Sequence, residues 1–260
     1  MPTLNRSTAA SVVTVQYVGL STDQFTFPPG YSEKQVIMDL ESLQSLKKAT
    51  VSTLRWLRLL QSSLRRLDVF GPGETGEPLT LVRPLDFGLV VVIKQAGDDV
   101  IDQLAKKLGP RAGWAGLLVM FDCLRVTAGA LQRLLPALTG LEDVTLDGSL
   151  SGAITDASLA ALHGCSQLRT MQLGTPRELC TDVPVTAVSR LVVTCRRLEW
   201  LIFHATKELS QSVLDALVRA DLGKRDDGTP RTLKFAVPAS VCEKLKKPPF
   251  TSSIKVCQLA

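Results

Sequence analysis

Apolar residues recur through the middle of the chain at a fixed spacing. Four pairs lie nine positions apart: Leu108 and Leu117, Leu135 and Val144, Leu162 and Met171, and Val192 and Leu201. Around each second member, one apolar residue stands three positions before it and another two positions after it. These L-x-x-L-x-L phrases begin at Trp114, Leu141, Leu168 and Leu198, which are 27, 27 and 30 residues apart. Self-similarity at such a period indicates stacked units that share one core.

The pattern predicts a short strand in each phrase and a helix between successive strands. Apolar positions at helical spacing follow Asp98, Thr127, Thr155 and Ser210, whose side chains can accept hydrogen bonds from first-turn amides. The predicted strands are Val12–Val18, Val36–Leu40, Leu67–Phe70, Leu89–Ile93, Leu117–Phe121, Val144–Leu146, Met171–Leu173, Leu201–Phe203, Leu233–Phe235 and Ile254–Val256. Strands that alternate with helices predict an α/β fold with a parallel sheet.

The segment from Ile154 to Leu173 carries a further signature. Thr155 and Asp156 open its helix, and Cys165 stands three positions before Leu168, a placement that Cys195 repeats before Leu198. The segment resembles the cysteine-containing, ribonuclease-inhibitor-like subfamily of leucine-rich repeat proteins. The resemblance implies a solenoid with a curved parallel sheet on its concave face and helices on its convex face.

The repeat pattern also predicts how the chain is divided. Residues 51–236 are expected to form the repeats, with capping segments at residues 1–50 and 237–260. Because each unit of such an array packs only on its neighbours, we expect one continuous domain.

Two neighbouring predicted strands, Leu89–Ile93 and Leu117–Phe121, have apolar residues at every position. Parallel strands have this composition when both faces of the sheet are covered. The helices would cover one face. The residues expected on the other face form a candidate partner-binding patch: Phe70, Val90, Val92, Leu118, Met120 and Phe121. The alternative is an internal cover, either the amino-terminal segment with Phe25 and Phe27 or the loop from Gly71 to Pro84.

A second candidate partner-binding cluster is Trp200, Ile202 and His204 on one predicted strand. Tryptophan is enriched at binding hot spots. Because Trp200 precedes a core leucine, it can alternatively cover the edge of the sheet near the helices.

No catalytic, cofactor-binding or metal-binding residues are expected. Gly71 to Gly76 match the G-x-G-x-x-G pattern of dinucleotide-binding loops, but Pro72, Pro78 and Pro84 interrupt the helix that phosphate binding would require. The six cysteines contain no C-x-x-C pair, and neither histidine has an evident acid or nucleophile partner. The sequence therefore favours a non-enzymatic protein.

The net charge of +5 is concentrated at the carboxyl-terminal end, where residues 223–260 hold eight basic and three acidic side chains. Such an end can meet an acidic partner or RNA, or be only a solvated cap. No stretch is long and apolar enough to span a membrane. Cysteines placed as core residues indicate a reducing, intracellular compartment, either cytoplasmic (including cytoskeletal or ciliary) or, from the acid-free first 22 residues, mitochondrial.

The leading functional interpretation is a protein-protein interaction module, as a structural or scaffold subunit of a larger assembly. It would bind its partner through the concave sheet and the loops between repeats. Two alternatives remain open: an F-box-like substrate adaptor of a ubiquitin ligase, with Val36 to Leu60 as the box, and an enzyme inhibitor or RNA-associated subunit.

Overall fold

The computed structural model describes residues 17–20, 48–51, 66–70, 89–108, 113, 115–224 and 228–259. Within these residues, ten strands form one sheet in the order of the sequence, and all nine strand pairs are parallel. The strands are β1 (Tyr17–Leu20), β2 (Lys48–Val51), β3 (Arg66–Phe70), β4 (Leu89–Lys94), β5 (Ala115–Phe121), β6 (Asp143–Leu146), β7 (Thr170–Leu173), β8 (Trp200–Phe203), β9 (Leu233–Pro238) and β10 (Ile254–Leu259). The predicted α/β class with a parallel sheet is confirmed.

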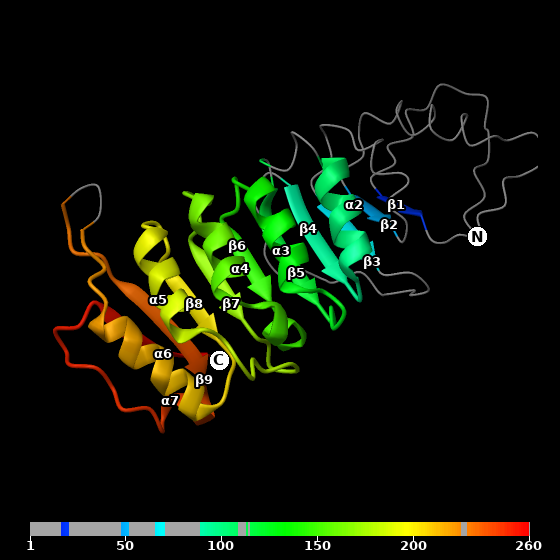
Figure 1. Cartoon of the computed structure of the whole chain (residues 1–260). Coiled ribbons are helices and arrows are strands. Elements are labelled where there is room, and N and C mark those ends of the chain that lie inside the picture. Colours follow the sequence, from blue (N-terminus) through cyan, green and yellow to red (C-terminus); the bar gives the residue numbers. More distant parts are fainter. Residues whose placement is uncertain are drawn as a thin grey trace, which may run out of the picture.

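Helices connect the strands and lie side by side along one face of the sheet (Figure 1). They are α2 (Asp98–Leu108), α3 (Ala128–Leu134), α4 (Asp156–Ala160), α5 (Val185–Thr194), α6 (Lys207–Arg219) and the short α7 (Ala239–Cys242). Single turns of 3-10 helix, η3 (Leu135–Ala137) and η5 (Ala161–Gly164), extend α3 and α4, and η4 (Gly148–Ala153) follows β6. The predicted strand at Val36–Leu40 and the loop from Gly71 to Pro84 lie outside the described residues.

Of the four predicted helix starts, three agree with the structure and one is wrong; α2 begins at Asp98. Thr127 and Thr155 cap α3 and α4 by accepting hydrogen bonds from Ala130 and Ser158. In α6 the cap is Thr206, whose side chain accepts from the Leu209 amide at 3.3 Å, and Ser210 lies buried within the helix. The helix thus begins one turn earlier than expected.

One continuous core lies between the sheet and the helices. Every second strand residue enters it, so β6, β7 and β8 share the same alternation of half-buried and fully buried positions. The fully buried positions are Val144 and Leu146, Met171 and Leu173, and Leu201 and Phe203. In these three strands the L-x-L part of the repeated phrase contributes its apolar side chains to this core, whereas in the phrase that begins at Trp114 the corresponding Leu117 and Val119 lie on the other face of the sheet.

Buried polar groups of three residues join successive strand-and-helix segments. The thiols of Cys165 and Cys195 donate to the carbonyl oxygens of Leu138 and Leu162, at 3.4 and 3.6 Å, in the turns that end the preceding helices. At the start of the next unit, Arg231 makes the corresponding contact with a guanidinium group. It is 2% exposed and donates to the carbonyls of Val192, Cys195 and Leu222 at 2.9 to 3.0 Å.

The guanidinium group of Arg231 donates hydrogen bonds to carbonyl groups at the end of α5 that have no donor within the helix. A cation at a helix carboxyl terminus is also favoured by the helix dipole. Arg231 therefore fastens the last turn of α5 to the beginning of β9.

Replacing Arg231 by Met should lower the free energy of unfolding by about 2 to 4 kcal/mol, because buried carbonyl groups lose their donors. Urea denaturation followed by circular dichroism measures the change. Arg219→Met is the matched control, since Arg219 is exposed on the last turn of α6. Equal stability of the two variants would contradict the role given to Arg231.

Candidate binding face of the sheet

The face of the sheet opposite the helices carries a small apolar cluster at β4 and β5. Val90, Val92, Leu117 and Val119 form it, and Phe121 packs against it half-buried. The prediction that Val90, Val92 and Phe121 point away from the helices is confirmed. The four aliphatic side chains expose only 3 to 7% of their surface in the isolated chain, however, so a partner cannot reach them in this state.

Leu118 and Met120 were expected on this face, and that prediction is wrong. Both are fully buried in the core beneath the helices. Leu118 pairs in register with Val144, and Met120 with Leu146. A shift of one residue in a strand moves every side chain to the other face, so Leu117 and Val119 take the places expected for Leu118 and Met120.

The sequence does not show which residues of the strand Ala115–Phe121 face the helices, because the strand contains no polar residue that would mark its solvent side. Phe70 pairs in register with Lys94, which is also paired with Phe121. The Phe70 side chain lies outside the described residues.

From β6 onward the same face becomes polar and partly open to solvent. We call this surface the open face and define it by the outward-pointing residues of β6 to β10: Asp143, Thr145, Thr170, Gln172, Trp200, Ile202, Lys234, Lys255 and Cys257. Trp200 and Ile202 are half-buried, so the structure brings two of the three residues of the predicted second cluster onto this face. The ammonium group of Lys234 lies 4.2 Å from the centre of the Trp200 ring.

His204, the third member of that cluster, is not available on the surface. It is 7% exposed, and its Nδ1 is buried without a hydrogen-bond partner among the described residues. Its backbone connects the end of β7 to the loop at Cys180, because its amide donates to the Leu173 carbonyl at 2.9 Å and its carbonyl accepts from the Cys180 amide at 2.8 Å. Loss of hydration on burial lowers the pKa of His204 below the ordinary value of 6.5.

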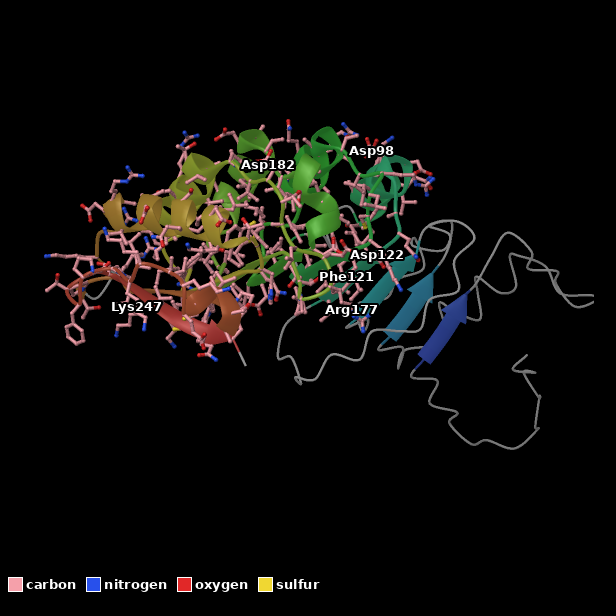
Figure 2. The ribbon with its side chains drawn as sticks, turned by 90° about the horizontal axis from the view of Figure 1, so that it is seen from below. Asp98, Phe121, Asp122, Arg177, Asp182 and Lys247 are labelled. Carbon is pink, nitrogen blue, oxygen red and sulfur yellow. The ribbon has the colours of Figure 1, made fainter. Side chains whose placement is uncertain are left out.

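The segments that follow β5 and β6 are joined by a buried acid that the sequence analysis did not identify. Asp147 is 1% exposed and accepts hydrogen bonds from the Asp122 amide at 2.9 Å and from both the amide and the hydroxyl of Ser149. Ser149 in turn accepts from the Cys123 amide at 2.8 Å. Figure 2 shows Phe121 and Asp122 together at this edge of the sheet. The sequence signal for this role was the position of Asp147, an acidic residue directly after the predicted strand Val144–Leu146 and before a turn.

Four of the buried thiols, those of Cys123, Cys165, Cys180 and Cys195, do not form a reactive site. Burial raises the pKa of Cys123 and Cys195 to about 12 and that of Cys165 and Cys180 to about 11. The thiolate is the nucleophile and the metal ligand, so these four groups are unreactive at neutral pH. Within the described ranges, no three His, Cys, Asp or Glu side chains gather in a way that could hold a metal ion. A search of the same ranges finds no helix with the length and apolar character needed to cross a membrane.

Comparisons with known proteins do not assign the chain to a family. No protein-family model matches the chain. No curated protein matches it either.

The buried histidine predicts a pH dependence of stability. Because the pKa of His204 is lowered in the folded chain, the unfolded chain takes up the proton first as the pH falls below about 6.5. The free energy of unfolding should therefore decrease between about pH 7 and the lower pKa of the folded state, and His204→Gln should remove part of this decrease. Urea titrations at several pH values measure it. His163→Gln should retain the His204 contribution, and an unchanged pH profile in His204→Gln would contradict the prediction.

Gly174 lies beside His204 at the end of β7 and allows a close approach of two loops. Its φ of +76° disfavours a side chain, and a Cβ atom would lie 2.3 Å from the carbonyl oxygen of His204. Gly174→Ala should therefore lower the free energy of unfolding by about 2 kcal/mol or more, as measured by urea denaturation. Gly152→Ala is the control, because no atom lies within 4 Å of its Cβ position, and it should change stability by less than about 1 kcal/mol.

Proposed function

We propose that the chain is a leucine-rich repeat solenoid that acts as a non-enzymatic protein-interaction module within a larger assembly. The order of the strands supports this proposal, since each strand pairs with the one before it in the sequence. The equivalent core residues Leu118, Val144, Met171 and Leu201 are 26, 27 and 30 positions apart. Arrays of this kind bind partners on the extended face that the stacked strands create.

The observation that carries the proposal is the contrast between the two ends of the sheet face opposite the helices. At β4 and β5 the cluster around Val92 and Val119 is closed to solvent. From β6 to β8 each strand instead presents two half-buried side chains on a rigid hydrogen-bonded support. Trp200 and Ile202 provide apolar area there, and Thr170 and Gln172 provide hydrogen-bonding groups, a composition suited to a protein interface.

The F-box-like adaptor is the weaker candidate. It would need the segment from Val36 to Leu60 to supply a helical box. Strand β2, Lys48–Val51, lies inside that segment and pairs with β1 and β3. This observation favours the interaction module.

Site-specific photocrosslinking tests the proposed face. A photoreactive amino acid at Gln172 should crosslink a partner in the native assembly, whereas the same group at Arg190, exposed on α5, should not. The crosslinked product is identified by mass spectrometry. Crosslinks formed only from Arg190 would place the partner on the helical side and contradict the proposal.

A pair of matched substitutions gives the second arm of the test. Ile202→Glu places a charge on the open face and should abolish the Gln172 crosslink, because an unpaired charge would be buried at the interface. Val193→Glu alters an apolar residue of α5 that is 39% exposed on the helical side, and it should leave the crosslink unchanged. Circular dichroism establishes that both variants are folded.

A further inference from the structure

Three residues form a row across the open face at the carboxyl-terminal end of the sheet. Trp200 of β8 pairs in register with Lys234 of β9, and Lys234 pairs with Lys255 of β10. Because neighbouring strands are about 4.8 Å apart, the three side chains are successive neighbours on one face. Both lysines are exposed, and the contact of Lys234 with the Trp200 ring places these two side chains on the same side.

The two lysines are an unfavourable pair within the chain. Like charges opposite each other on adjacent strands destabilise a sheet. Other basic side chains have acidic partners, as in the ion pair of Arg133 with Asp102 at 2.6 Å. Across the ranges that the structure covers, no ion pair joins Lys234 or Lys255 to an acidic group. A ligand that brings negative charge to this row would therefore relieve repulsion as well as form new ion pairs.

The neighbours of the row restrict what that ligand can be. A second copy of the chain would bring the same lysines together with its own, so charge repulsion opposes it. Single-stranded nucleic acid binds along grooves with several stacked aromatic side chains. Among the residues that define the open face, Trp200 is the one aromatic side chain, which is too few for such a groove. In the next row, the half-buried side chain of Ile202 offers apolar contact instead.

We propose that Trp200, Lys234 and Lys255 bind an acidic, extended segment of a partner protein. The proposal rests on the proposed function, and it specifies the chemistry of the partner at one end of the open face. Carboxylate side chains of the segment pair with the two ammonium groups, while its aliphatic portions pack on Trp200 and Ile202. Electrostatic complementarity of this kind contributes to specificity and to the rate of association.

A short fluorescent poly-glutamate peptide is the probe, titrated against the full chain by fluorescence anisotropy. Lys234→Glu and Lys255→Glu should each weaken binding about tenfold, and binding by the original chain should weaken as salt is added. Lys247→Glu is the matched control. The amide of the adjacent Lys246 donates to Gln211 of α6, so this segment lies beside the helices, and the control should change affinity less than about twofold.

The outcomes separate the inference from the proposed function. No binding of poly-glutamate, or equal weakening by all three variants, would overturn the acidic-segment site. Tighter binding of poly-uridine RNA that depends on Lys234 and Lys255 would overturn it in favour of nucleic acid. If the Gln172 crosslink persists in Lys234→Glu and Lys255→Glu, the interaction module stands without this site. If the Gln172 crosslink is absent from the unaltered chain, the proposed function itself fails.

Discussion

Each strand from β5 to β8 must place every second side chain under the helices, because one strand and one helix have too little apolar surface to form a core alone. In a parallel sheet, residues paired in register point to the same face, so each strand fixes which residues of the next strand face the helices. If Leu118 faces the core, its register partner Val144 must face it too, and so must Met171 and Leu201 further along the sheet. The identity of the residues on the open face follows from this requirement.

The same requirement leaves the opposite face free to vary in chemistry. That face changes from a closed aliphatic cluster at β4 and β5, through hydroxyl and amide groups at β6 and β7, to an aromatic ring and two ammonium groups at β8 to β10. A long partner lying across the strands would therefore meet different chemistry at each end. Polarity of this kind can define the direction in which a partner binds as well as its identity.

The sequence predicted most elements from β3 onward, but it did not predict β2 (Lys48–Val51), and β1 (Tyr17–Leu20) shares only two residues with the predicted strand Val12–Val18. The nine-residue spacing located β6 to β8 correctly, because polar residues alternate with apolar ones there, as at Thr145 and Gln172. It misplaced the face of Leu118 and Met120 because a wholly apolar strand has no marked side. The start of α6 was missed because Ser210 and Thr206 can both cap a helix, and only the structure shows which one does.

The candidate binding residues were harder to predict than the elements, since exposure depends on contacts distant in the sequence. Val90 and Val92 point away from the helices as expected and are nonetheless buried. His204 follows Ile202 by two positions and is still buried, because the loop at Cys180 pairs with its backbone. The contact of Trp200 with Lys234 could not be predicted, because Lys234 lies 34 positions later and only the register of β8 and β9 brings the two residues together.

The buried groups that join successive strand-and-helix segments differ in chemistry along the sheet. Cys165 and Cys195 use thiols, whereas the next unit uses the guanidinium group of Arg231. Oxidants convert thiols to sulfenic and higher acids, but a guanidinium group has no such reaction. Burial protects the two thiols, so peroxide would attack them only when the middle of the array opens. Oxidation would then remove the thiol contacts of Cys165 and Cys195 with the preceding turns, whereas the guanidinium group of Arg231 would not itself be altered.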